Sequence, residues 1–293
     1  MLSILFSTAL AAAALTQQID STIPVERGQR LAVSAFAGEI AVSAWNRNAV
    51  RVEADPGGRS RVDISRAGAT LEVRTHGRRG TAGMVDLKIS VPAWMPLDLS
   101  GVHTDVSVAG ARGPVTVETV QGQITVEGGE GLVSLQSVEG AVSLRGAKGR
   151  IEVHSVNEDV AVSASSGDLT VETVNGEILL RQVDATGLAA STVNGDIGYD
   201  GPVRNGGRYS LSSHNGDLRL TVADGTNAAV EVSTFNGEFE SEFPVTLTET
   251  RKGKRFSFTL GSGSAQVSLE SFQGSILLVR PGSRRTEDDH DPE

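Results

Sequence analysis

Apolar and polar residues alternate through the middle of the chain in segments of nine residues that follow one another without a gap. From Gly113 the segments read GPVTVETVQ, GQITVEGGE, GLVSLQSVE, GAVSLRGAK, GRIEVHSVN, EDVAVSASS, GDLTVETVN and GEILLRQVD. The third and fifth residues of each segment are apolar, as at Val115 and Val117, and mostly Thr, Ser or Glu stands between them. This two-residue alternation is typical of β-strands. A repeat this short indicates a solenoid.

Every second segment carries a third apolar residue at its eighth position, so the structural unit is about 18 residues long. We expect this column, together with the third and fifth positions, to fill a narrow aliphatic interior. Followed outward, the column contains Phe36, Val102, Val120, Val138, Val156, Val174, Val193, His214, Phe235 and Phe272. The wider later spacings indicate longer loops, and we expect two turns between Phe235 and Phe272. His214 is expected to be a hydrogen-bonded interior or corner residue.

The turn residues agree with sharp corners between strands. Asn-Gly recurs at Asn175-Gly176, Asn194-Gly195, Asn215-Gly216 and Asn236-Gly237. Glycine and asparagine tolerate positive φ, which lets a strand turn sharply. One isolated Asn-Gly would indicate a hairpin, and an antiparallel β-sandwich or meander is the alternative fold. The regular recurrence favours an all-β solenoid with coils of about 18 residues and β caps.

The rhythm divides the chain into four parts. Residues 1–16 form an apolar run ending near an Ala-x-Ala pattern, which predicts a signal peptide. The run lacks the initial positive charges of such peptides, and a buried N-terminal segment is the alternative. Residues 17–100 contain a first coil and short strands near 50–53, 62–65, 71–74 and 84–91, interpreted as an N-terminal β cap over the open end of the stack.

Residues 101–280 form the predicted solenoid. We expect strands near 245–248, 255–260 and 266–269 to close its far end, with Phe243, Phe256 and Phe258 as plugs. Residues 281–293 are charged and predicted to be a disordered tail. After removal of the leader, no segment is apolar and long enough to cross a membrane as a helix.

Composition narrows the classes of function. Glycine supplies 34 of the 293 residues, and helix should be scarce. The net charge of −10 opposes nonspecific nucleic-acid binding. The chain contains no cysteine, which excludes disulfides, thiolate metal sites and cysteine nucleophiles.

With these features the chain resembles a family of bacterial β-strand-repeat proteins of unknown function, known as putative adhesins and related to the head domains of auto-transporter adhesins. The resemblance covers residues 20–280 and rests on the leader and three motifs: Ala37-Gly38-Glu39-Ile40, Ile89-Ser90-Val91-Pro92 leading into Leu97-Asp98-Leu99, and Val-Asn-Gly-Glu/Asp-Ile at 174–178 and 193–197. It implies a single-stranded right-handed β-helix and an adhesin-like role. It implies no catalytic residue.

One acidic residue follows the corner in each of five coils, and we identify these five as a candidate acidic ligand or cation edge: Asp159, Glu177, Asp196, Asp217 and Glu238. Carboxylates stacked about 5 Å apart repel by roughly 1 kcal/mol in water, and bound Ca²⁺ would relieve the repulsion. The alternative is a solvated edge compensated by Arg150, Arg181, Arg204 and Arg219. We assign no catalytic, cofactor-binding or metal residue.

Two other motifs point to weaker sites. GGEGLVSLQ, at 128–136, is similar to the calcium-binding nonapeptide GGxGxDxUx, but Val133 stands where that motif has aspartate. The five histidines show no metal-ligand spacing. A basic patch of Arg74, His76, Arg78 and Arg79 is either a docking site for an acidic polymer or headgroup, or a solvated loop.

These observations favour a non-catalytic protein that is exported to the periplasm or cell surface and serves as a binding or structural scaffold of the envelope. Its expected partner is an envelope protein or polysaccharide, with no nucleic acid. A polysaccharide lyase or hydrolase is the enzymatic alternative, although only 4% of residues are aromatic and short coils leave little room for a groove. A ligand-free component of the envelope stress response is the third reading. The pattern leaves the oligomeric state open.

Overall fold

The computed structural model describes residues 19–55, 60–77, 83–245 and 254–283. The predicted signal peptide (1–16) and most of the predicted tail (281–293) lie outside these ranges. The predicted strand near 245–248 lies outside them too, apart from its first residue.

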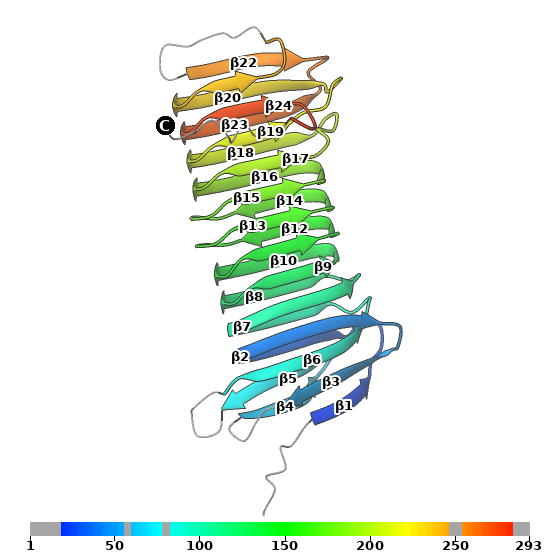
Figure 1. The fold of residues 1–293 in the computed structure, drawn as a ribbon. Coiled ribbons are helices and arrows are strands. Elements are labelled where there is room, and N and C mark those ends of the chain that lie inside the picture. Colours follow the sequence, from blue (N-terminus) through cyan, green and yellow to red (C-terminus); the bar gives the residue numbers. More distant parts are fainter. Residues whose placement is uncertain (1–18, 56–59, 78–82, 246–253, 284–293) are drawn as a thin grey trace, which may run out of the picture.

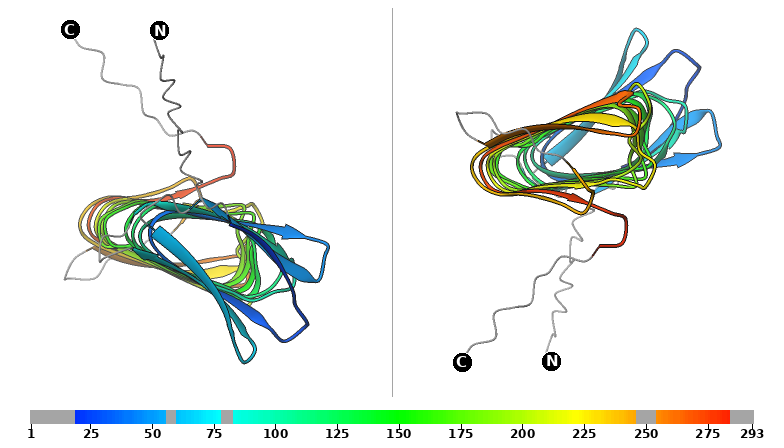
Figure 2. Two further views of the ribbon diagram at one scale, coloured as in Figure 1. Left: turned by 90° about the horizontal axis from the view of Figure 1, so that it is seen from below. Right: turned by 90° about the horizontal axis from the view of Figure 1, so that it is seen from above.

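The described residues build an all-β structure in which 24 strands join one long, mostly parallel sheet. Figure 1 shows the strands piled along a single axis, and Figure 2 shows the chain circling a flattened oval when the stack is seen from its ends. This arrangement is consistent with a β-solenoid. The described part of the chain contains no helix of the length and apolarity needed to cross a membrane.

The oval has two long sides, each of which is a ladder of hydrogen-bonded strands. In order along the stack, ladder 1 contains β4 (Ser60–Ala67), β5 (Thr70–Gly77), the first half of β2 (Arg30–Trp45), the first half of β7 (Leu97–Ala111), β8 (Val115–Gln121), β10 (Glu130–Glu139), β12 (Lys148–His154), β14 (Ser166–Glu172), β16 (Asp184–Asn194), β18 (Arg208–Asn215), β23 (Ala265–Gln273), β20 (Ala228–Asn236) and β22 (Lys254–Leu260).

Ladder 2 forms the opposite side. It contains β1 (Ile19–Pro24), β3 (Ala49–Asp55), β6 (Val85–Pro92), the second halves of β2 and β7, β9 (Ile124–Gly128), β11 (Val142–Arg145), β13 (Val160–Ser163), β15 (Ile178–Arg181), β17 (Ile197–Asp200), β19 (Leu218–Thr221), β24 (Ile276–Val279) and β21 (Phe239–Ser241). A layer is one strand of each ladder. Within a layer the chain passes from ladder 1 to ladder 2 at what we name the Gly corner, for example at Gly122 between β8 and β9. It reaches the next layer through the return corner, for example at Gly129 between β9 and β10.

The register of the ladders follows the repeat. Val115 pairs with Val133, and Val133 pairs with Ile151, so partners stand 18 residues apart. Loops in later layers widen this offset to 19 residues between Ile178 and Ile197 and to 21 between Leu188 and Tyr209. Like side chains therefore stack on like side chains along the axis.

The core is the narrow space between the two ladders. The third and fifth residues of each nine-residue segment point into it and are buried, as predicted, among them Val117, Leu135, Val153, Ile124 and Leu144. Stacking is required for stability, because one layer alone cannot cover its apolar face. Tyr199 and Tyr209 fill the interior where the 201–207 loop enlarges a layer, and their rings lie 5.8 Å apart.

Antiparallel strands cover both ends of the stack. At the N-terminal end β4 pairs with β5, and β3 pairs with both β1 and β6. At the other end β22 pairs with β20, and Phe239 stacks against Phe256 and Phe258 at 5.6 and 5.7 Å. The observed β3 to β6 agree with the four short strands predicted between residues 50 and 91.

The last strands of the chain do not occupy the end of the stack. β23 lies between β18 and β20, and β24 lies between β19 and β21 (Figure 1). The expectation that Phe272 lies two turns beyond Phe235 is therefore wrong. The two corners Asn236-Gly237 and Gln273-Gly274 are interchangeable as neighbours of Asn215-Gly216, so the repeat pattern does not distinguish the inserted order from the sequential one.

Candidate functional site

The column of eighth-position residues stacks as predicted but lies on the outside of the molecule. We name it the outer ridge: Phe36, Val102, Val120, Val138, Val156, Val174, Val193, His214, Phe272 and Phe235. Val120 is 45% exposed and Phe235 is 58% exposed. The predicted interior position is wrong because Val120 stands three residues after the inward-pointing Val117, and the two-residue period turns it outward.

Aromatic rings stack at both ends of the outer ridge. Phe36 meets His103 edge to face, with ring centroids 5.6 Å apart. The ring of Phe272 lies between those of His214 and Phe235, at 4.8 and 5.0 Å, and all three are nearly parallel. His214, expected to be a hydrogen-bonded interior or corner residue, is instead an exposed member of this aromatic stack at the corner.

Buried hydroxyl groups on the inner side of the ridge bond its strands to the Gly corner. The residue before each ridge position is a buried Ser or Thr in most layers, and its hydroxyl donates to a carbonyl of the Gly corner. Ser213 Oγ donates to Gly195 O at 2.9 Å, and Thr192 Oγ1 donates to Gly176 O at 3.3 Å. Within the described residues, the buried hydroxyl of Ser155 is one of two side-chain groups without a partner.

Side-chain amides form a second line beside the ridge. Asn175 donates to Asn157, Asn194 donates to Asn175, and Asn215 donates to Asn194, at 2.7 to 3.1 Å. These bonds connect one layer to the next at the Gly corner. The ridge therefore rests on a hydrogen-bonded frame and presents its apolar side chains in fixed positions.

The five predicted edge residues lie in one line at the Gly corner, interrupted in one layer. Asp159 Oδ1 accepts a hydrogen bond from the backbone N–H of Glu177 at 2.7 Å, and Asp196 Oδ1 accepts one from Asp217 N at 2.8 Å. Asp217 Oδ1 accepts one from Ser275 N, which places the inserted layer between Asp217 and Glu238. Three of the carboxylates therefore connect their layer to the next one by accepting a hydrogen bond from its backbone.

Two of the arginines expected to compensate this edge bind other groups. Arg204 pairs with Asp184 at the return corner, and Arg219 donates to the carbonyl of Ser283 at 2.6 Å. Over the described ranges, no group of three or more histidine, aspartate or glutamate side chains is arranged to hold a metal ion. Whether the acidic edge binds cations stays a prediction.

Carboxylates border the outer ridge on both sides. Two residues before the ridge, on the outer face of ladder 1, stand Glu118, Glu172 and Glu270; three residues after it stand Glu39, Asp105 and the predicted acidic edge. In the strands that carry ridge residues, neither position holds a lysine or arginine. In the covering strands at the two ends, Arg74 pairs with Ser34 and Arg255 pairs with Ser233 on the flank before the ridge. At the last layer Lys254 approaches, and its Nζ donates to Gly237 O at 2.9 Å. The ridge is thus a largely apolar line whose margin after the Gly corner is acidic in most layers, whereas its margin before the corner carries a carboxylate in three layers and Ser, Gln or His in the others.

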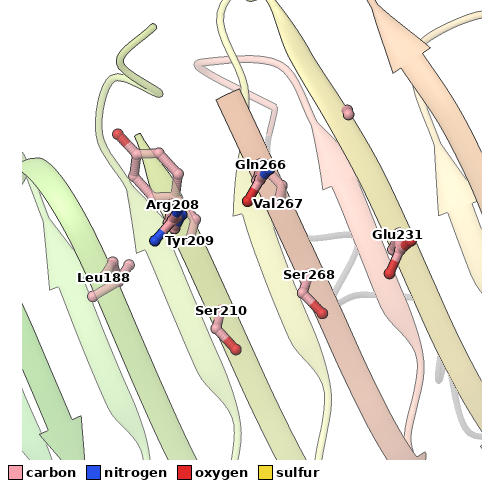
Figure 3. A pocket seen from close by; sticks show the side chains of 9 residues that line it. Leu188, Arg208, Tyr209, Ser210, Glu231, Gln266, Val267 and Ser268 are labelled. Carbon is pink, nitrogen blue, oxygen red and sulfur yellow. The ribbon is translucent and has the colours of Figure 1, made fainter. Parts of the chain in front are cut away.

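A cavity of about 480 Å³ opens across β16, β18, β23 and β20 (Figure 3). Its outward-facing lining includes Arg208, Ser210, Ser268 and Glu231, whereas Tyr209 belongs to the core. The cavity forms because Ser210 and Ser268 are short and leave the strand backbones uncovered. Glu231 is the one carboxylate in its lining, and glycoside hydrolysis generally uses two.

The two buried tyrosines next to this cavity are structural. The hydroxyl of Tyr209 donates to Ala185 O at 2.8 Å, and that of Tyr199 donates to Val183 O and Pro202 O at 3.1 Å. Burial raises the pKa of both phenols, so neither is ionised near neutral pH. These bonds anchor the loop that enlarges the layer.

The predicted basic patch near residue 76 is compensated where it is described. Arg74 lies 3.1 Å from Glu72, and His76 lies 3.6 Å from Asp63. Arg78 and Arg79 lie outside the described residues. The patch therefore contributes no defined cationic site here.

Several solved structures are similar to this chain. A "putative cell adhesion protein" from Clostridium sporogenes shares 9% identity, with 90% of this chain and 100% of that chain covered and a TM-score of 0.22. A "putative adhesin" from Parabacteroides distasonis shares 10% identity over 90% and 97% of the chains, with a TM-score of 0.35. A "putative lipid binding protein" from the same organism shares 12% identity over 89% and 96%, also at 0.35. No curated protein matches.

One family model matches most of this chain. The model of the Toastrack DUF4097 family aligns with residues 16–278, which include every layer of the stack and both sets of covering strands. The resemblance drawn from the leader, the corner motifs and the strand repeat agrees with this result. The chain belongs to the Toastrack DUF4097 family.

Proposed function

We propose that the protein is a non-catalytic, adhesin-like scaffold of the bacterial envelope, exported to the periplasm or cell surface, that binds a partner protein along the outer ridge. The carrying observation is the line of ridge side chains from Phe36 to Phe235. Most of them are exposed and apolar, whereas Val102 and Val138 are half-buried and His214 is an imidazole. Monomeric proteins rarely expose large contiguous apolar surface, and such surface marks interaction sites. As a finer part of the proposal, the stack is a single-stranded right-handed β-helix with coils of about 18 residues. The 18-residue pairing offset supports the coil length.

The chemistry of the margins specifies the partner. Glu118, Glu172 and Glu177 stand beside valines, and in the strands that carry ridge residues no arginine or lysine occupies these flanking positions. A complementary surface carries apolar side chains bordered by lysine or arginine. A polysaccharide fits this ridge poorly, because valine offers neither hydrogen bonds nor a flat aromatic face. The partner that the ridge favours is an envelope protein with a basic, apolar segment.

Support for a non-catalytic role comes from the site chemistry. The cavity of Figure 3 holds one carboxylate, and the described residues bring together no metal-binding cluster. The aspartates of the acidic edge are engaged in backbone hydrogen bonds between layers. The repeated groups of this fold are therefore used for stacking.

A defined peptide tests the proposal. A fluorescently labelled peptide of alternating leucine and lysine should bind the protein, as measured by fluorescence anisotropy. Replacing three ridge valines by isosteric threonine, in the triple variant Val120→Thr, Val156→Thr and Val174→Thr, should weaken binding about tenfold or more, because apolar contact area is lost. Leu132→Thr is the matched control, since Leu132 is 42% exposed on the same ladder but lies off the ridge.

Two further measurements separate the outcomes. A peptide of alternating leucine and glutamate should not bind, because carboxylates flank the ridge. Equal affinity of the triple variant and the Leu132→Thr control, or equal binding of the two peptides, would remove the ridge as the binding surface.

A further inference from the structure

The two tryptophans of the chain line one cavity near the N-terminal end of the stack. Trp45 is the last residue of β2, and Trp94 lies in the turn between β6 and β7. Together with the ends of β6 and β7 they surround a space of about 470 Å³ at the return corner. Small-molecule sites typically enclose about 300–1,000 Å³. This cavity lies across the oval from the outer ridge.

Each indole is held in place and faces a guanidinium group. Trp45 Nε1 donates to Ala49 O at 2.8 Å, and Trp94 Nε1 donates to Asn48 Oδ1 at 3.4 Å. The Arg47 Cζ atom lies 5.2 Å from the Trp45 ring centroid, and Arg27 Cζ lies 5.7 Å from that of Trp94. Both indoles are partly exposed. The site therefore combines two indoles held by hydrogen bonds with exposed guanidinium groups, of which that of Arg47 lines the cavity.

The cavity is electropositive in a chain whose net charge is −10. Arg47 and Arg112 line it, the carboxamides of Asn46 and Asn48 stand between them, and the lining contains no aspartate or glutamate. Arg112 is exposed and forms no ion pair with any described residue, while its backbone N–H donates to Ala93 O at 2.7 Å. Its guanidinium is available to a ligand.

We propose that this tryptophan cavity binds an acidic sugar, a pyranose unit that carries a carboxylate. An indole face covers the C–H face of a sugar ring, the carboxamides exchange hydrogen bonds with hydroxyl groups, and Arg47 and Arg112 bind the carboxylate. A simple inorganic anion has no C–H face that could stack on the two indoles. A neutral sugar carries no negative charge that could pair with the two arginines of the lining.

Tryptophan fluorescence provides a direct readout, because both tryptophans of the protein line this cavity. Titration with trigalacturonate and with a glucuronate-containing disaccharide should change the emission saturably for at least one of them. Fully methyl-esterified trigalacturonate, which has the same ring and no charge, should bind about tenfold more weakly or worse. Inorganic phosphate should not reproduce the change.

Substitutions identify the binding groups. Arg112→Gln and Arg47→Gln should each weaken binding of the acidic sugar about tenfold, whereas Arg255→Gln, on β22 at the far end of the stack, should leave it unchanged. Far-ultraviolet circular dichroism checks that each variant is folded. The inference fails if neither acidic sugar binds, if the ester binds equally well, or if Arg112→Gln and Arg47→Gln bind like the wild type. Because the ridge is not involved, these results are independent of the proposed protein partner.

Discussion

At the scale of the residue, glycine at the Gly corner is required by the distance between layers. A Cβ atom built on Gly195 would collide with the backbone carbonyl oxygen of Gly176 in the neighbouring layer, and Gly195 has φ of +153°. The same collision recurs at Gly216 with Gly195 O. The recurring Asn-Gly pairs thus reflect both a turn conformation and the absence of space for any side chain.

Replacing one of these glycines should be costly. Gly195→Ala should lower the free energy of unfolding by about 3 kcal/mol, because it adds backbone strain to a steric clash. Gly225→Ala is the control, since Gly225 also has positive φ, at +83°, but has open space around its Cβ position. It should cost about 1 kcal/mol. Urea denaturation measures both; equal losses would show that layer spacing does not constrain Gly195.

The Arg204–Asp184 pair makes stability depend on pH at another single position. The Arg204 guanidinium holds the pKa of Asp184 below its ordinary value of 3.8. The stabilisation is therefore present above pH 3.8 and is lost as the pH falls through the lowered pKa. Both side chains are largely exposed, so the contribution is small.

The expected effect is a gap in melting temperature that closes in acid. Asp184→Asn should melt about 1–3 °C below the wild type at pH 7 and together with it near pH 2. Arg204→Gln should show the same behaviour. A gap that persists unchanged at low pH would mean that the two substitutions act through packing and not through the ion pair.

At the scale of the element, the strands were predictable from the two-residue period, but the face of one column and the order of the last layers were not recognised. Val115 and Val117 point inward, and Thr119 takes the next inward position because its hydroxyl finds a backbone carbonyl at 3.2 Å. Because successive side chains of a strand point to opposite faces, Val120, which follows the inward-facing Thr119, points outward. The insertion of β23 has no local signal, because Phe272 and Phe235 stand in equivalent corner motifs.

Insertion makes β20 dependent on residues that follow it in the chain. Removing residues 262–293 deletes β23 and β24, and β20 then loses its parallel partner. Amide hydrogen exchange in β20 and β21 should accelerate by about tenfold or more, while β8 to β15 keep their protection, because layers contact only their neighbours. Unchanged protection in β20 would contradict this dependence and would mean that β20 pairs with β18 in place of β23 in the truncated protein.

At the scale of the whole molecule, the stack separates two surfaces of opposite character. The outer ridge follows the Gly corner along the axis beside carboxylates, whereas the tryptophan cavity occupies the return corner near the N-terminal end and is lined by arginine. The acidic edge was predictable because its residues recur with the repeat. The cavity was not, because Trp45 at the end of β2 and Trp94 in a turn belong to no repeated position, and only the pairing of β2 with β6 and β7 brings them together.

The position of β23 also governs when the structure is finished. Chains generally fold from the N-terminus as they emerge from a ribosome or a pore. Each ladder 1 strand from β8 to β18 has a template as soon as it appears, because it pairs with a strand that precedes it in the chain. The layer of β20 and β21 does not, since β23 and β24, which lie between it and the layer of β18 and β19, emerge last. The far end of the stack is therefore completed only after β24 has emerged, and a chain interrupted before residue 265 keeps an unpaired sheet edge at β18.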